Sequence, residues 1–467
     1  GKFYGYDVVA KNGQGGLTGM GNQPSINDFG QVAFIGQSGG GESIWVGDGV
    51  TAARNINPGS INPGRVIFGA GLQINNQNKI GAQDRLVAAT PGSTLRVWDA
   101  TLTDSFVNVA RAGLGQPFDA VFGFASINDS GVAAAGALTG VQRLLIRGTA
   151  IPPAQFGITG PSPQPMIADD GRIVIRTGIF PNFQIVLFLA NLGGFTTIAN
   201  GPNFTSLDNA PGISDDGKII AFKGDLSAAG ATALGTTPGP GIFASIDEGG
   251  GTRKIVRITG RQVENVPAAG PDNDGECEPG ETCMPAAEMG FDDSDNIITF
   301  ASYAPDMRIS VSHVDFGAPG IDDDTFRISF MATPSSASRS NFAAGGIPLL
   351  FSGQLGLWTI RVDVNQDLDT PRQRVYNPQT AIPVAQVGDR IDGATITSLG
   401  VGFSIGQAAK NEQSPATFRT MRRGDHRAVF WADTSAGNMI IRASHVDSDY
   451  DGLLDIWETA GIDMDQD

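Results

Sequence analysis

The chain of 467 residues has little positive charge and no long apolar segment. Its 31 lysines and arginines are outnumbered by 48 aspartates and glutamates, so the formal net charge is −17. Nucleic acids and anionic membrane surfaces are bound by basic surfaces, and this balance therefore argues against both as partners. No apolar run reaches the roughly 18 residues that a bilayer-spanning helix needs. The sequence predicts no membrane span.

Groups that commonly carry catalysis are also scarce. The chain has three histidines, His313, His426 and His445, and they are far apart in the sequence. It has no Gly-x-Ser-x-Gly nucleophile elbow and no His-Glu-x-x-His zinc motif. A pair of carboxylates, which is enough for a glycosidase, stays open among so many acidic residues. We therefore expect no enzyme, with a polysaccharide-cleaving site as the alternative.

Two cysteines, Cys277 and Cys283, lie in the stretch DGECEPGETC. Two close cysteines could form half of a zinc site, but three histidines leave few residues to complete it. A disulfide between Cys277 and Cys283 is the favoured interpretation, and it indicates an oxidising compartment outside the cytoplasm. The chain begins at Gly1 rather than at a methionine, which is typical of a mature or trimmed product.

Glycine is abundant, with 64 residues, and 27 prolines accompany it. The glycines follow no Gly-X-Y period, which excludes collagen. They fall at turns between short apolar runs, and 40% of the residues are hydrophobic whereas 17% are charged. This pattern predicts a folded, all-β chain.

A short motif recurs along the chain. It combines an apolar residue, an Asn/Asp/Ser turn and, in the better copies, a glycine before a new strand. The copies are SINDFGQVAF from Ser25, QINNQNKIGA from Gln73, SINDSGVAAAG from Ser126, MIADDGRIVIR from Met166, GISDDGKIIAF from Gly212, GFDDSDNIITF from Gly290, GIDDDTFRISF from Gly320 and AAKNEQSPATF from Ala408. We expect Gly30, Gly131, Gly171 and Gly217 to take the positive φ that such a turn needs.

Each turn and strand is followed by a further apolar strand, for example SIWVGDG from Ser43, RISVSHV from Arg308 and RAVFWAD from Arg427. Units of about 40 to 50 residues with several strands are typical of propeller blades. We therefore predict a β-propeller of seven or eight blades over residues 1–445, with insertions near 265–290 and 331–400. A linear solenoid is the alternative architecture.

The repeats resemble the tandem IND-x-G-x-VAF repeats of bacterial secreted and cell-surface proteins, which are thought to form β-propellers. The resemblance covers roughly residues 20–445. It implies an exported, extracellular or cell-surface protein, and it implies no activity.

An acidic stretch, DSDYDGLLDIWE, follows the last repeat. Counted from Asp447, its acidic residues occupy positions 1, 3, 5, 9 and 12, which are Asp447, Asp449, Asp451, Asp455 and Glu458. Gly452 stands at position 6, and Leu453 at position 7 would offer its carbonyl, as in an EF-hand loop. A strand-like segment precedes it, so it is more similar to the calcium repeats of dockerins and thrombospondin type 3 segments. Residues 446–467 are thus predicted to bind Ca²⁺, with a solvated acidic tail as the alternative.

Three further stretches have alternating oxygen ligands. A second, incomplete loop would begin with Asp463, Asp465 and Asp467. DNDGECEPGE carries Asp272, Asp274 and Glu276, and DVNQDLD carries Asp363, Asn365, Asp367 and Asp369. Both are candidate calcium loops, and for DVNQDLD a solvated turn is the alternative.

The N-terminal stretch from Phe3 to Ala10 is strand-like. It is expected either to close the propeller against the last blade or to pair with a neighbouring subunit. From these features we predict a non-catalytic, extracellular, calcium-binding structural protein that assembles with copies of itself. The alternative is a propeller that binds or cleaves a cell-surface polysaccharide.

Overall fold

The repeated turn joins the two inner strands of a small sheet. In the computed structural model, the first copy places β3 (Ser25–Ile26) antiparallel to β4 (Val32–Ser38), with the turn Asn27–Gly30 between them. Gly30, Gly131, Gly171 and Gly217 have φ values of 82°, 77°, 85° and 72°, which confirms the predicted conformation. In the copy from Gln73, which has no glycine in its turn, Asn78 takes this position with φ 57°. Asparagine tolerates the left-handed region better than most residues.

The structure describes most of the chain between residues 4 and 444. The described ranges are 4–21, 23–39, 41–58, 65–67, 71–86, 92–140, 142–148, 154–157, 160, 164–179, 181–189, 194–259, 266–267, 283–284, 300–305, 307–314, 324–335, 339–340, 349–350, 353–366, 374–378, 381–406 and 427–444.

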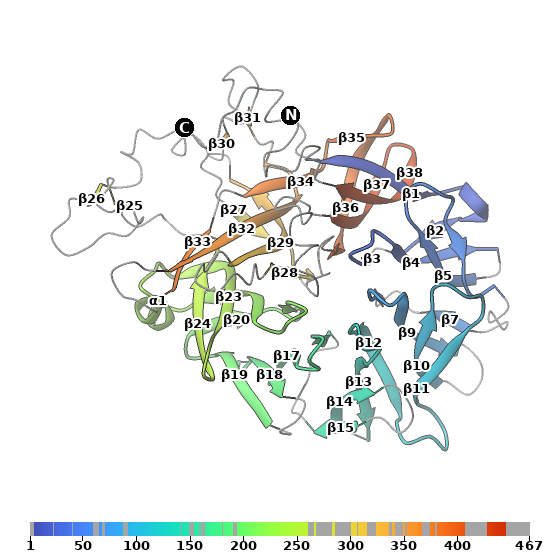
Figure 1. Ribbon diagram of the computed structural model, residues 1–467, viewed down its shortest axis with the longest axis horizontal. Helices are drawn as coiled ribbons and strands as arrows, with labels where there is room; N and C mark the ends of the chain where they lie inside the picture. Colours follow the sequence, from blue (N-terminus) through green and yellow to red (C-terminus); the bar gives the residue numbers. More distant parts are fainter. Residues whose placement is uncertain are drawn as a thin grey trace, which may run out of the picture.

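Within these ranges the strands form seven antiparallel sheets around one axis, a seven-bladed β-propeller (Figure 1). Blade 1 comprises β2 (Gly19–Met20), β3, β4, β5 (Gly41–Gly47) and β6 (Arg54–Asn55). Blade 2 comprises β7 (Arg65–Ile67), β8 (Gln73–Ile74), β9 (Lys79–Leu86), β10 (Gly92–Asp99) and β11 (Phe106–Arg111). Blade 3 comprises β12 (Ala120–Ile127), β13 (Ala133–Thr139), β14 (Gln142–Gly148) and β15 (Ala154–Gly157).

The ring continues in chain order. Blade 4 comprises β16 (Met166–Ile167), β17 (Ile173–Thr177), β18 (Gln184–Leu189) and β19 (Gly194–Asn200). Blade 5 comprises β20 (Phe204–Leu207), β21 (Gly212–Ile213), β22 (Ile219–Leu226), β23 (Gly239–Gly249) and β24 (Thr252–Arg257). Blade 6 comprises β27 (Phe300–Tyr303), β28 (Ser310–Val314), β29 (Asp324–Pro334), β32 (Gly356–Gln366), β33 (Arg374–Pro378) and β34 (Ile382–Gln386). Blade 7 comprises β35 (Arg390–Ile391), β36 (Ala394–Gly406), β37 (Arg427–Thr434), β38 (Gly437–Ser444) and β1 (Gly5–Lys11).

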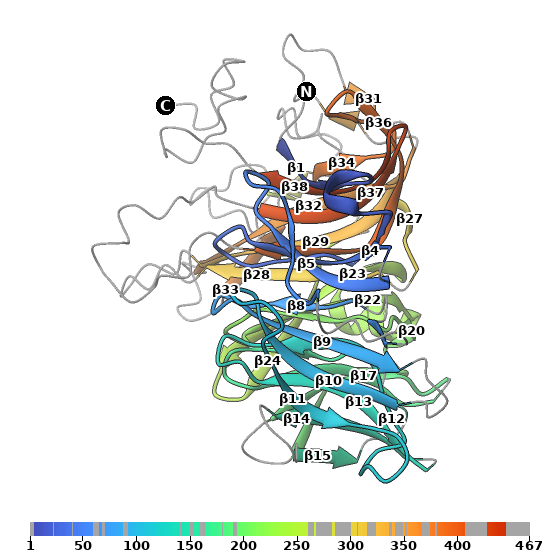
Figure 2. The same cartoon turned by 90° about the vertical axis from the view of Figure 1, so that its right-hand side faces the viewer.

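A few short elements lie outside the blades. They are the 3₁₀ turn η1 (Gln14–Gly16), the helix α1 (Ala228–Leu234) and the two-stranded pairs β25 (Val266–Pro267) with β26 (Cys283–Met284) and β30 (Arg339–Ser340) with β31 (Leu349–Leu350). Among the described residues no helix is long and apolar enough to span a bilayer. Figure 2 views the ring edge-on, with the blade strands running across its thickness.

The N-terminal strand closes the ring. β1 pairs antiparallel with β38, so the first strand of the chain becomes the outermost strand of the last blade. Of the two interpretations of this stretch, the closing strand is confirmed. Arg442 of β38 also contacts the Asp7 carboxylate of β1 at 2.6 Å. A linear solenoid is excluded by this pairing.

Seven of the eight repeat copies account for blades 1 to 6, because two of them contribute to blade 6, and the copy from Ala408 lies outside the described residues. The copy at Gly290 ends in β27, and the copy at Gly320 leads into β29, and both strands belong to one sheet. RISVSHV, expected as the strand that follows a turn and its strand, instead forms an inner strand, because β28 precedes β29 and pairs with it. RAVFWAD likewise forms β37, which pairs with the inner strand β36. The region 331–400, predicted as an insertion, contains β32, β34 and most of β36.

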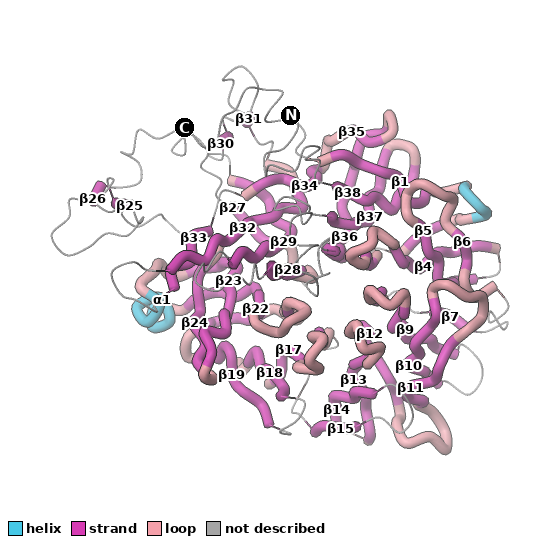
Figure 3. The backbone as a smooth tube through the Cα atoms, viewed as in Figure 1, coloured by secondary structure: helices cyan, strands magenta, loops and turns pink. Residues whose placement is uncertain are grey.

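Hydrophobic contacts between neighbouring blades form the core. One cluster joins Ile35 and Ile44 of blade 1 to Ile74 and Ile80 of blade 2. Both faces of a blade are covered in this way, which explains why Val32, Ala33 and Phe34 are all buried although successive residues face opposite sides. The turns between inner strands gather around the axis (Figure 3).

Candidate ligand site on the propeller axis

The third residue of the repeat, an asparagine in blades 1 to 3, stabilises its own turn and bonds to the next blade. The side-chain oxygen of Asn27 accepts a hydrogen bond from the Gln31 amide at 2.9 Å, and its Nδ2 donates to the Asn75 carbonyl at 3.2 Å. Asn75 donates to the Asn128 carbonyl at 2.7 Å, and Asn128 to the Ala168 carbonyl at 3.1 Å. We call these bonds the asparagine suture, and it links blades 1 to 4.

The fourth residue of the repeat adds a second set of bonds. The backbone amide of Asn76 donates to Asp129 Oδ1 at 2.9 Å, and the amide of Asp129 donates to Asp169 Oδ1 at 2.8 Å. The Nδ2 group of Asn76 lies between the carboxylates of Asp28 and Asp129, at 2.7 and 2.9 Å. These acidic turn residues therefore hold blades together, which is a structural use of their carboxylates.

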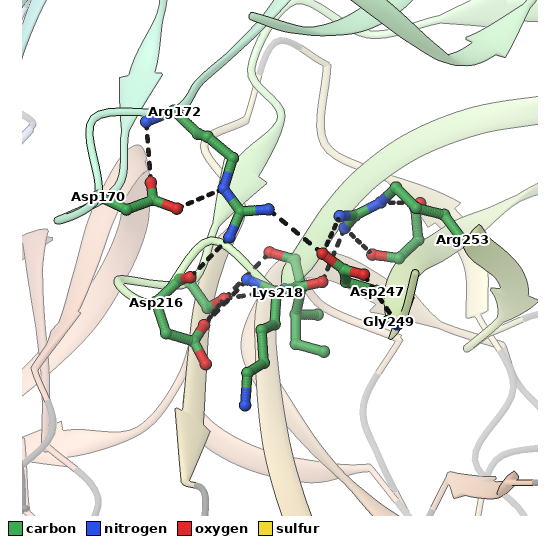
Figure 4. Close-up of polar contacts among 10 residues, drawn as sticks. Asp170, Arg172, Asp216, Lys218, Asp247, Gly249 and Arg253 are labelled. Carbon is green, nitrogen blue, oxygen red and sulfur yellow. Dashed lines mark hydrogen bonds and ion pairs between the residues drawn. The ribbon is translucent and has the colours of Figure 1, made fainter. Parts of the chain in front are cut away.

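The suture changes between blades 4 and 5, where Ala168 offers no amide side chain. Arg172 takes over this role, as Figure 4 shows. Its Nη2 donates to the Asp216 carbonyl of blade 5 at 2.9 Å, and its Nη1 lies 3.3 Å from Asp247 Oδ2. Its Nε donates to Asp170 in its own turn. An arginine thus replaces the asparagine as the link between the blades.

Arg253 completes the cluster drawn in Figure 4. Its Nη2 donates to the Lys218 carbonyl at 2.7 Å, its Nε donates to Ser245 Oγ at 3.0 Å, and its Nη1 lies 3.5 Å from Asp247. Burial lowers the pKa of Arg253 to about 10, and the Asp247 carboxylate acts in the opposite direction. All three of its nitrogens have partners within blade 5, and the shared Asp247 joins it to Arg172 of blade 4, so this cluster is structural.

Arg308 differs from these arginines. It lies just before β28 of blade 6 and is only 5% exposed. Its guanidinium carbon is 4.1 Å from the ring of Phe124 in blade 3, and its Nη2 is 3.9 Å from the sulfur of Met166 in blade 4. A side chain from blade 6 that touches blades 3 and 4 must cross the axis. Within the described part of the chain, its Nε and Nη1 have no hydrogen-bond partner.

Residues from other blades crowd the same layer of the axis. A Cβ added to Gly71 of blade 2 would lie 2.2 Å from Gln23 Oε1 of blade 1 and 2.6 Å from Phe124. Gln23, Gly71 and Phe124 each stand two residues before the first residue of their repeat copy. Phe124 is the residue that joins this group to Arg308, because its ring also lies against the guanidinium.

The contacts in this layer change where the repeat departs from its pattern. In blades 1 to 3 the first repeat residue bonds to the next blade: Ser25 Oγ accepts from the Ile74 amide at 3.1 Å, and Gln73 Oε1 accepts from Ser126 Oγ at 2.7 Å. Blade 4 has Met166 at this position, whose thioether is at best a weak acceptor. Blade 5 has Gly212, where a Cβ would lie 2.4 Å from the Ile309 carbonyl. The missing side chain lets the segment that carries Arg308 approach the axis.

Burial sets the electrostatics of this site. Desolvation lowers the pKa of Arg308 to about 9, so the side chain remains charged at neutral pH. A buried charge without a partner is costly, and an anion is the group that relieves it most effectively. The sequence pattern did not reveal this residue, because Arg308 appeared as the first residue of an ordinary strand.

Most predicted calcium ligands lie outside the described residues. These are Asp447, Asp449, Asp451, Leu453, Asp455, Glu458, Asp463, Asp465, Asp467, Asp272, Asp274, Glu276, Asp367 and Asp369. Asp363 and Asn365 lie in β32, where Asp363 pairs with Thr325 and Asn377. The first half of DVNQDLD is therefore a strand. The four calcium sites stay predictions.

The cysteines and histidines are likewise little described. Cys277 lies outside the described residues, and Cys283 pairs through its backbone with Pro267 in the β25–β26 ladder. The predicted disulfide stays a prediction. The side chains of His313, His426 and His445 are not described. Where side chains are described, no cluster of three or more His, Cys, Asp or Glu residues could hold a metal ion.

No protein-family model matches the chain, and no curated protein matches it. Solved propellers are similar in fold. An oligogalacturonate lyase from Vibrio parahaemolyticus is 9% identical with a TM-score of 0.48, over 96% of this chain and 98% of that chain. The β-propeller domain of the Trilobed protease from Pyrococcus furiosus is 10% identical with a TM-score of 0.42, over 96% and 99%. One of two prolyl endopeptidases is 8% identical with a TM-score of 0.44, over 90% and 46%.

These neighbours contradict our expectation of a non-catalytic structural protein that assembles with itself. The similar propellers include those of a lyase and of peptidases, which are enzymes. The expectation rested on a scarcity of motifs, and a propeller builds its sites from side chains that converge from separate blades. Identities of 8–10% indicate a shared fold and assign no residue role.

Proposed function

We propose that this protein is an extracellular propeller that binds an anionic ligand on its axis, with Arg308 as the anchoring residue. One observation carries the proposal: a buried, charged guanidinium at the axis has two unpaired N–H groups in the described structure. The guanidinium matches a carboxylate in charge and in shape, because its donors lie in one plane. A carboxylate-bearing polysaccharide of the cell surface is the ligand class that we propose.

The direction of approach follows from the charge around the axis. The inter-blade turns carry Asp28, Asp129, Asp169 and Asp215 near one mouth. Their negative potential disfavours an anion at that mouth. The ligand is therefore expected to enter from the opposite face, with its acidic group leading, and to place that group against Arg308. Gln23 and Phe124 would contact the part of the ligand next to the carboxylate.

Calcium belongs to the proposal through the sequence. The five carboxylates from Asp447 to Glu458 have the spacing of a calcium loop. We propose that this loop binds Ca²⁺ and stiffens the segment after blade 7. Millimolar calcium and oxidising conditions outside cells suit such a loop and a Cys277–Cys283 disulfide.

Titration calorimetry with defined oligosaccharides tests the axial site. The wild-type protein should bind oligogalacturonate or oligomannuronate and should not bind a neutral oligosaccharide of equal length. Arg308→Gln should weaken binding at least about 100-fold, since losing a buried charged hydrogen-bond partner costs about 3 kcal/mol or more. Arg308→Lys should restore part of the affinity, because the charge returns without the planar fork.

Arg111→Gln is the matched control. Arg111 is exposed on the outer strand of blade 2, and its substitution removes the same charge from the protein. It should leave affinity unchanged apart from a small effect of net charge. If Arg308→Gln and Arg111→Gln bind the acidic oligosaccharide equally well, the axial site is wrong.

A further inference from the structure

A row of buried hydroxyl groups crosses blade 6 beside Arg308. Ser312 of β28, Ser329 of β29 and Thr359 of β32 are 5%, 0% and 1% exposed. In the described structure none of the three side-chain oxygens has a hydrogen-bond partner. Ser329 stands directly opposite Ser310 on one side and Thr359 on the other. The three side chains therefore belong to one face of the sheet.

This face points towards blade 7. Val311 reaches Gly212 of blade 5, since its Cγ2 is 3.1 Å from the Cβ position of that glycine. Neighbouring residues of a strand face opposite sides, so Ser310 and Ser312 face away from blade 5. β28 also contacts β36, the inner strand of blade 7. The hydroxyl row consequently lies in the seam between blades 6 and 7, and Arg308 stands at its axial end.

The spacing of the row selects its occupant. Ser329 and Thr359 are directly opposed, and such residues have Cβ atoms about 5 Å apart, whereas Ser312 stands diagonally from Ser329. Two hydroxyls at this spacing bond poorly to each other, but a molecule that makes two hydrogen bonds of about 2.8 Å spans the gap. A buried hydroxyl left without a partner destabilises the folded state. A sugar ring is too large to reach residues that are 0–1% exposed, whereas buried water is the molecule that satisfies such polar groups inside proteins.

We propose that the seam between blades 6 and 7 binds a row of water molecules that bridge Ser312, Ser329 and Thr359 and end at the Arg308 guanidinium. The row connects the axis to the outer strands through a polar path in an otherwise apolar interface. This inference is independent of the proposed ligand, because it rests on the three hydroxyls.

Removal of single hydroxyls tests the proposal through the sign of a stability change. Thr359→Val and Ser329→Ala remove the hydroxyl with almost no change in shape or volume. If water bridges these groups, each variant leaves a bound water short of a partner. The midpoint of thermal unfolding should then fall by about 1–2 °C. Thr259→Val is the matched control, since Thr259 Oγ1 has a protein partner, Tyr303 OH, at 2.6 Å, and its midpoint should also fall.

If the seam between blades 6 and 7 contains no water, the midpoint of thermal unfolding should change in the opposite direction. Removing an unpaired hydroxyl from a dry interface stabilises a protein, so a rise in the midpoint for Thr359→Val and Ser329→Ala would overturn the proposal. A crystal structure at high resolution gives the second measurement. Ordered waters within hydrogen-bond distance of both Ser329 Oγ and Thr359 Oγ1 would support the row, and direct contact of blade 7 side chains with these oxygens would refute it.

Discussion

Blades 1 to 4 and blades 5 to 7 share one architecture but hold their neighbours in different ways. In the first group, Asn27, Asn75 and Asn128 repeat the same bond from blade to blade. In the second group the repeat residues change, and arginines supply the contacts. Arg172 links blade 4 to blade 5, and Arg442 donates to the Gly30 carbonyl where blade 7 meets blade 1. Regular repeats build the ring, and where they depart from their pattern the segment that carries Arg308 packs at the axis.

Arg308 illustrates this difference. The regular positions at the axis are filled by groups that bond to one another, such as Gln73 and Ser126. Met166 and Gly212 interrupt that pattern, and there the Arg308 side chain of blade 6 occupies the axis. Its Nε and Nη1 have no hydrogen-bond partner in the described structure. Under the proposed function, stability and ligand binding belong to different parts of the same ring.

The largest loss of stability is expected when an asparagine of the suture is replaced. Asn75→Ala removes the acceptor for the amides of Gln77 and Lys79 and the donor to the Asn128 carbonyl. Asn75 is 5% exposed, so these groups lose partners out of reach of water. At about 1–2 kcal/mol for each, the free energy of unfolding in urea should fall by about 3–6 kcal/mol.

Asn203→Ala is the control for this substitution, because Asn203 is exposed in a turn. Its effect should stay within about 0.5 kcal/mol. A loss below about 1 kcal/mol for Asn75→Ala would mean that the suture contributes little to the ring.

The second prediction uses the irregular half. Arg308→Met should raise the free energy of unfolding by about 1–4 kcal/mol, because a buried charge without a partner is replaced by an apolar chain of similar length. The same variant should lose affinity for the acidic ligand. A destabilised variant would show that Arg308 supports the fold, and the axial site would then need another anchor.

The difference in unfolding free energy between Arg308→Met and the wild-type protein should depend on pH in a defined direction. Burial lowers the pKa of Arg308 to about 9 in the folded protein from an ordinary value of 12.5. Above about pH 9 the unfolded chain therefore binds more protons at this residue, and wild-type stability gains with rising pH relative to Arg308→Met. The advantage of the variant in urea unfolding should shrink from pH 8 to pH 10. Binding of the acidic ligand by the wild-type protein should weaken over the same range.

Sequence and structure agree where the determinants are local. The turn motif predicted the positive φ of Gly30 and the strand that begins at Val32, because both depend on adjacent residues. Blade number was less certain, since two copies near Gly290 and Gly320 share one sheet. The sequence did not predict the position of Arg308 at the axis, because its contacts, Phe124 and Met166, are remote in the sequence. A charged residue at the start of an apolar inner strand was its only signal.

The third prediction concerns Arg172, which links blade 4 to blade 5 where the asparagine suture ends. Arg172→Gln should lower the free energy of unfolding by about 1–2 kcal/mol, because Arg172 is 20% exposed and its bonds to Asp216 and Asp247 are partly screened. Ala168→Asn would place an amide where the suture is missing, with the Ser214 carbonyl as its acceptor. The double variant should therefore lose less than Arg172→Gln alone, and a double-mutant cycle measures the difference. Additive effects would indicate that an asparagine cannot take over the link.

The smallest effect is expected at a surface contact of the closing strand. Lys11 of β1 lies 3.2 Å from Asp392, and the two side chains are 49% and 54% exposed. Exposed ion pairs contribute little, because water and salt screen them and both side chains lose conformational freedom. Lys11→Gln should therefore change the free energy of unfolding by no more than about 0.5 kcal/mol, although β1 closes the whole ring. The backbone ladder between β1 and β38 and the buried side chains of Val9 and Ala10 provide that closure instead. Urea unfolding at low and at high salt checks this assignment. A large, salt-dependent loss of unfolding free energy in Lys11→Gln would show that the ion pair contributes to ring closure.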